Sequence, residues 1–117
     1  MSTLLNFQRD INGYNAYAPA PSTDNFSATL ASGTAASITV PSNFDTWVFV
    51  PSSQPGTDVW VDFTGATAAV PVGGTFASTT SVLNPGPRVV PKGTSISMIT
   101  DSTTAEVGVS FYANINA

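Results

Sequence analysis

The sequence predicts an all-β protein: a single antiparallel β-sandwich of jelly-roll type, with about eight strands and an extended N-terminal arm. From Phe26 onward, short runs of alternating apolar and polar residues are separated by Gly, Pro, Asn and Asp. This spacing, roughly ten residues per run, is typical of antiparallel all-β domains, and no segment has the apolar period of a helix. An eight-stranded small barrel uses the same alternation, so the sequence leaves sandwich and barrel open.

Residues 1–25 are predicted to form the extended arm, and residues 26–117 the sandwich domain. The Ala-Pro-Ala-Pro run at residues 18–21 excludes a helix there, because each Pro lacks an amide donor and restrains the residue before it. An arm without a periodic pattern needs another surface to lie on, and its aromatic residues are candidate interface residues: Phe7, Tyr14 and Tyr17. Whether that surface belongs to its own domain, a neighbouring subunit or another protein stays open.

The first predicted strands follow the arm. Phe26, Ala28 and Leu30 are expected on one face, and the same pattern resumes at Ile38 and Val40 after a turn. The next run, Thr46 to Val50, is apolar on both faces. We therefore expect it to be a central strand covered on both sides.

The strand after the Pro55-Gly56 turn places its residues on two distinct faces. Val59, Val61 and Phe63 are predicted to point inward. The intervening residues are predicted to lie on the opposite, solvated face: Asp58, Trp60 and Asp62.

The remaining strands are bounded by Gly and Pro. Two are predicted at Ala66 to Val72 and at Thr75 to Leu83, separated by Gly73-Gly74. After the Asn84-Pro85-Gly86-Pro87 turn, we expect strands at Arg88 to Val90 and at Thr94 to Thr100. In the last strand the expected inward residues are Val107, Val109 and Phe111, and the expected outward residues are Glu106, Ser110 and Tyr112.

The composition argues against several classes of function. Three Lys and Arg residues cannot form the basic surface that nucleic acid requires, and the chain has no His or Cys for zinc, thiol or imidazole chemistry. No apolar run approaches the length of a membrane span. For these reasons we expect no enzyme activity and no cofactor. We also expect no metal, because the two carboxylates of Asp101 and Glu106 are too few oxygen ligands for calcium.

Trp60 and Arg88 are further candidate interface residues. Asp58 and Asp62 are too far apart along one strand to act as a glycosidase pair. An exposed tryptophan such as Trp60, between them, is typical of the centre of a protein interface. A glycan- or receptor-binding site around Trp60 is the alternative. As one of three cations, Arg88 is expected to pair with an acid on a neighbouring strand or subunit.

Five short motifs resemble small virion structural proteins of tailed bacteriophages, over residues 35–113. They are Asp58-Val-Trp-Val-Asp62, Ala69-Val-Pro-Val-Gly73, Val82-Leu-Asn-Pro85 with Arg88, Gly93-Thr-Ser-Ile-Ser97 and Val109-Ser-Phe-Tyr-Ala113. The resemblance implies a capsid decoration (cement) protein without an active site, made in the host cytoplasm and located in the virion. Its expected partner is the major capsid protein or another virion protein, and its expected state a homotrimer. A head-fibre, tail or adaptor component is the alternative.

Overall fold

The computed structural model describes residues 3–4, 7–9, 15–19 and 21–114. Within these residues the regular secondary structure is entirely β, which confirms the predicted class. The strands are β1 (Phe7–Arg9), β2 (Asn15–Pro19), β3 (Asp24–Ala31), β4 (Ala36–Thr39), β5 (Thr46–Ser53), β6 (Val59–Asp62), β7 (Ser81–Leu83), β8 (Arg88–Pro91), β9 (Ser95–Thr100) and β10 (Thr104–Ala113). No helix in this part of the chain is long and apolar enough to cross a membrane.

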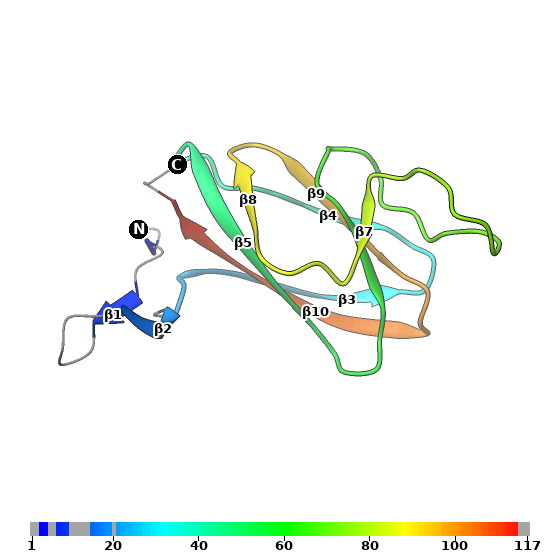
Figure 1. The fold of residues 1–117 in the computed structure, drawn as a ribbon, viewed down its shortest axis with the longest axis horizontal. Coiled ribbons are helices and arrows are strands. Elements are labelled where there is room, and N and C mark those ends of the chain that lie inside the picture. The colour runs from blue at the N-terminus through cyan, green and yellow to red at the C-terminus, as the bar shows by residue number, and fades with distance from the viewer. Residues whose placement is uncertain (1–2, 5–6, 10–14, 20, 115–117) are drawn as a thin grey trace.

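Strands β3 to β10 form two antiparallel sheets of four strands each (Figure 1). The first has the order β3-β10-β5-β8 and the second the order β4-β9-β6-β7. Most consecutive strands lie in different sheets, so the chain repeatedly crosses from one sheet to the other. Strands β1 and β2 pair only with each other.

Both sheets contribute side chains to one core. Its largest members, Trp47, Phe49 and Phe111, come from the adjacent strands β5 and β10 and have no exposed surface. Phe111 lies 6.4 Å from Trp47 and 5.9 Å from Phe49, measured between ring centroids. Val61 and Ile96 of the second sheet close the same core at 0% exposure.

Burial confirms the predicted faces of several strands. β5 is central, as expected, with β10 on one side and β8 on the other. The expected inward residues of β6 and β10, with Phe63 just after β6, are buried or packed against the core: Val59, Val61, Phe63, Val107, Val109 and Phe111. In β3, Leu30 is buried, whereas Phe26 is 42% exposed because β3 is an edge strand.

One predicted strand was wrong, and another was correct only at its end. Ala66 to Val72 is not a strand, and of Thr75 to Leu83 only β7, Ser81–Leu83, is one. The intervening backbone is held by side-chain hydroxyls and not by a neighbouring strand, and Gly73 has the positive φ of 87° that breaks an extended run.

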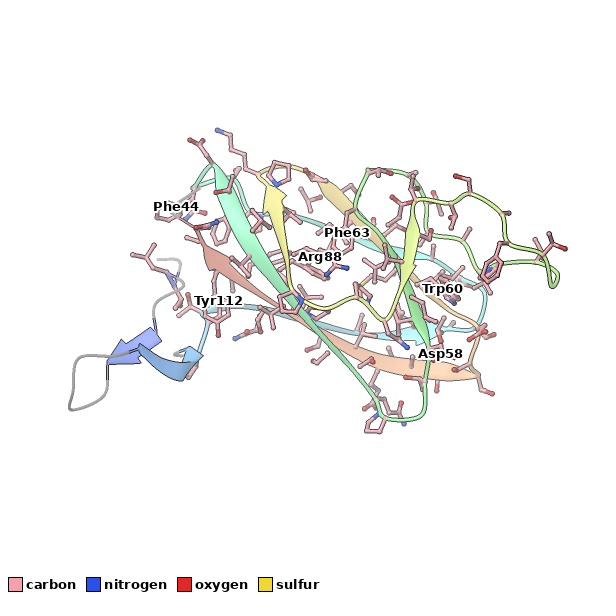
Figure 2. The ribbon with its side chains drawn as sticks, in the orientation of Figure 1. Phe44, Asp58, Trp60, Phe63, Arg88 and Tyr112 are labelled. Carbon is pink, nitrogen blue, oxygen red and sulfur yellow. The ribbon has the colours of Figure 1, made fainter. Side chains whose placement is uncertain are left out.

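Tyr112 departs from the sequence expectation in a different way. It lies on the outer face of its sheet, as its alternation with Phe111 predicts, but it is only 6% exposed. The backbone amide of the next residue, Ala113, donates to the carbonyl oxygen of Thr3 at 2.9 Å, and Leu4 forms a parallel bridge with Ala113. The N-terminal segment therefore lies along the end of the strand that carries Tyr112 (Figure 2).

The predicted arm contains an antiparallel strand pair. Phe7 in β1 is the register partner of Pro19 in β2, and Tyr17 lies in β2; Tyr14 falls outside the described residues. β3 begins at Asp24, within the predicted arm, and the hydroxyl of Ser22 donates to the carbonyl oxygen of Phe111 at 2.6 Å. The last residues before the predicted boundary are thus tied to β10, while the boundary itself stays a prediction.

Phe111→Ala should lower the free energy of unfolding by about 3–5 kcal/mol, because it removes a fully buried ring that contacts three other aromatic residues. Denaturant unfolding followed by near-ultraviolet circular dichroism measures this change. The matched control is Val89→Ala, which truncates a 61% exposed side chain and should change stability by less than about 0.5 kcal/mol. Equal losses in the two variants would contradict this assignment of the core.

Candidate functional site

The most distinctive surface feature is the β6–β7 loop, residues 63–80, which projects from one end of the molecule (Figure 1). It exceeds the length of roughly 12–15 residues above which irregular loops are uncommon and usually functional. No charged residue occurs between Asp62 and Arg88. The loop is therefore an uncharged extension of the second sheet.

Asp62 joins the start and the end of the loop. The sequence predicted a solvated strand residue at this position, but the side chain is buried, with 1% of its surface exposed. One carboxylate oxygen, Oδ1, accepts from the Thr64 amide at 2.8 Å and the Thr64 hydroxyl at 2.5 Å. The other, Oδ2, accepts from the Thr80 hydroxyl at 2.6 Å. The prediction failed because the loop folds over the outer face of β6.

These hydrogen bonds set the ionisation of Asp62. Burial raises the pKa of its carboxyl group, while hydrogen bonds from the side chains of Thr64 and Thr80, the Thr64 amide and the Ser81 side chain lower it. The hydrogen bonds together outweigh burial, so the pKa lies below its ordinary value of 3.8. Asp62 is therefore an ionised structural carboxylate at neutral pH.

Two further hydrogen bonds attach the first part of the loop to the sheet. The Ala68 amide donates to the Ser97 hydroxyl oxygen of β9 at 2.9 Å, and the Ala69 amide donates to that of Ser81 in β7 at 3.1 Å. Ala68 is buried, whereas every residue from 71 to 80 is exposed. The loop thus has an anchored base and a fully exposed tip.

The tip carries two large apolar side chains in contact with solvent. Val72 is 95% exposed and Phe76 is 107% exposed, more than any other large apolar residue in the described part of the chain. A rigidly anchored, uncharged segment with exposed apolar residues is the kind of surface that contacts protein. Alternation of residues places both side chains in strands and so does not reveal this site, although the sequence does show a long uncharged stretch that contains Gly and Pro.

Trp60 lies at the base of the loop. Its register partners across the outer face are Ile99 of β9 and Leu83 of β7. Its indole Nε1 is buried and makes no hydrogen bond with the described residues. A cavity of about 500 Å³ lies between the indole and loop residues 69–77 and 79. Trp60 is therefore half-buried under the loop, and not fully exposed as the sequence predicted.

Asp58 and Asp62, which flank Trp60, do not form one site with it. Asp58 is exposed (Figure 2). Its carboxylate accepts a hydrogen bond from the Asn84 side-chain amide at 3.1 Å. Asn84, with a φ of 43°, in turn accepts from the Val59 amide at 2.9 Å through Oδ1. Asp58 therefore helps to hold the turn before β8, while Asp62 holds the loop.

Among the residues that the structure describes, Arg88 has no acidic partner on a neighbouring strand. Its Nη1 donates to the carbonyl oxygens of Gly86 and Pro87, both at 3.2 Å, so the side chain folds back on its own turn. An ion pair is instead made by Lys92 and Asp45, whose Nζ and Oδ1 lie 3.1 Å apart. Pairing of Arg88 with an acid on another subunit stays a prediction.

The described residues contain no group of three or more His, Cys, Asp or Glu side chains arranged to hold a metal ion. Comparisons with protein-family models, with curated proteins and with solved structures found no match.

Asp62→Asn should lower the free energy of unfolding by about 1–3 kcal/mol at pH 7, because it replaces a charged acceptor inside a satisfied network. The folded-state pKa of Asp62 is depressed, so its contribution is fully present above the unfolded value and is lost as the pH falls through the folded value. The difference between wild type and variant should therefore shrink below about pH 4. Denaturant unfolding at a series of pH values measures it.

The matched control is Asp45→Asn, which removes a 93% exposed carboxylate from a surface ion pair. This variant should change stability by no more than about 1 kcal/mol. Limited proteolysis should cut residues 71–80 faster in Asp62→Asn than in this control. Identical cleavage rates would contradict the assignment of Asp62 as the anchor of the loop.

Proposed function

We propose that this protein is a non-enzymatic virion structural protein that binds and stabilises the capsid surface of a tailed bacteriophage as a homotrimer. The observation that carries the proposal is the anchored, uncharged loop tip with Val72 and Phe76 exposed, which is suited to contact with protein. The resemblance of residues 35–113 to small phage virion proteins supplies the identity of the assembly.

We further propose that the two sheets form a β-sandwich of jelly-roll type. The sheet orders β3-β10-β5-β8 and β4-β9-β6-β7 support it, because they distribute eight antiparallel strands over two sheets with the first and last strands as neighbours. Jelly rolls of this kind are common in viral capsid domains and in lectins. The fold therefore agrees with a capsid protein and also with a glycan-binding module.

The role of the buried carboxylate also supports a non-enzymatic function. Asp62 is the most shielded acid among the described residues, and its two oxygens hold Thr64 and Thr80. A general acid or base needs an oxygen that reaches the substrate. Asp62 is engaged with the loop and cannot take that role without releasing it.

Deleting residues 1–20 should abolish binding to capsids and leave the domain folded. This deletion keeps Ser22, whose hydroxyl bonds to β10, and the whole of β3. Co-sedimentation with capsids assembled from the major capsid protein without this chain measures the binding, and circular dichroism measures the fold. A folded deletion variant that binds as well as the full chain would show that the arm residues, Phe7, Tyr14 and Tyr17 among them, are not the contact.

Cryo-electron microscopy of the saturated capsid then distinguishes the proposed position from its alternatives. Density repeated over the shell supports a decoration protein, whereas density at a single vertex supports a head-fibre, tail or adaptor component. No binding to shell or vertex contradicts the virion proposal as a whole.

A glycan-binding module is the second candidate, favoured by the cavity of about 500 Å³ beside Trp60, which falls within the size range of small-ligand sites. In that case bacterial surface polysaccharide should quench Trp60 fluorescence in a saturable way, and Trp60→Ala should abolish the effect. The other tryptophan, Trp47, is fully buried and serves as the internal control. The capsid proposal expects no saturable quenching.

A further inference from the structure

We infer that the exposed loop tip of one copy inserts Phe76 into an apolar groove between β3 and β4 of a second copy, in a head-to-tail contact that closes into a ring. The inference deepens the proposed function and rests on its homotrimer, but it does not depend on binding to a capsid.

The groove lies where edge strands of the two sheets stand apart. β3 is at the edge of the first sheet and β4 at the edge of the second, and the groove between them has a volume of about 240 Å³. Its lining is mostly apolar and contains no charged residue; it includes Phe26, Ala28, Ile38, Met98, Val107 and Val109. Phe26 leaves 42% of its surface exposed there, with its other side stacked edge-to-face on Phe111 at 5.9 Å.

The loop tip has the matching properties. The structure describes the side chains of six phenylalanines. Two of them, Phe49 and Phe111, belong to the core, and two more, Phe44 and Phe63, are partly buried and pack against the core. Phe26 and Phe76 are the two that remain substantially exposed. An apolar cavity of about 150 Å³ can hold a benzene molecule, so a groove of 240 Å³ has room for the ring of Phe76.

The contact forms without burying an unpaired ion. The loop has no charged residue, and neither does the lining of the groove. The penalty for desolvating a charge, which opposes most contacts between proteins, therefore does not arise. Edge-to-face packing of Phe76 on Phe26 adds the geometric preference of aromatic pairs.

A heterologous contact of this kind builds either a closed ring or an open filament, and the proposed homotrimer selects the ring. The loop tip and the groove are different surfaces, so two copies joined by them leave one free tip and one free groove. A phenylalanine buries only about 150–250 Å², which is small beside a stable interface of roughly 800 Å² per partner. Closing the ring gives every copy two contacts and raises the overall stability through effective concentration.

The test compares the mass of the full chain and two variants by sedimentation velocity over a range of concentrations. Wild type should form a closed oligomer, expected to be the trimer. Phe76→Ser, which removes the tip, and Ala28→Trp, which fills the groove, should each be monomeric, with association weakened by about 30-fold or more. Val89→Ser, which changes a 61% exposed apolar side chain outside the contact, should keep the wild-type mass.

Mixing the two monomeric variants gives the sharper result. Phe76→Ser retains the groove and Ala28→Trp retains the tip, so an equimolar mixture can make one contact per pair and no ring. It should therefore form one-to-one heterodimers only at concentrations well above those at which the wild-type ring assembles. Circular dichroism should show wild-type folding in both variants, since both positions are exposed. If Ala28→Trp does not fold, Ala36→Trp fills the same groove from β4.

Several results overturn the inference. A monomeric wild type or an oligomer unchanged by Phe76→Ser excludes the tip-in-groove contact, and so does a mixture of the two variants that rebuilds rings of the wild-type size. A trimer that persists in Phe76→Ser overturns this contact while keeping the homotrimer. A ring that forms as described and yet does not bind capsids supports the contact and contradicts the proposed virion function.

Discussion

The pairing of β5 with β10 is the interaction on which the rest of the structure depends. These two central strands place Phe49 opposite Phe111 and Trp47 opposite Ala113, so that the three largest buried rings lie side by side. The second sheet packs its Val and Ile side chains against those rings, and the edge strands β3 and β8 extend the first sheet on either side. The N-terminal residues also attach to the end of β10. The first sheet, the core and the N-terminal segment are therefore all positioned by this pair.

Polarity in this protein comes mainly from hydroxyl groups. With only 9% charged residues, the chain fixes its loop by bonds from Thr and Ser to a single buried carboxylate, where many proteins use surface ion pairs. Such bonds are short-range and directional, so they fix the base of the loop without adding charged side chains to its tip. The exposed tip can then present apolar side chains without a charged rim. The use of hydroxyl groups in place of charged groups thus accounts both for the low charge of the chain and for the uncharged loop tip.

Much of the fold was accessible from the alternation of residues, because burial in a sheet follows a period of two. The inward faces of β6 and β10 and the central position of β5 were predicted for that reason. Alternation, however, assigns a residue to a face and does not reveal what covers that face. Asp62 and Tyr112 were placed on outer faces correctly and are buried by segments that alternation cannot locate. The Ser- and Thr-rich run before β7 has strand-like composition, but it lacks a neighbouring strand to pair with, and pairing is not encoded locally.

The parallel bridge between Leu4 and Ala113 places both ends of the described chain at the side of the molecule opposite the projecting loop (Figure 1). A polypeptide fused to the N- or C-terminus therefore leaves the domain far from residues 71–80. Fusion partners, fluorescent labels or displayed antigens can be attached at that end without obstructing the loop. The chain ends and the loop tip can therefore be altered or labelled independently, because the β-sheets separate them.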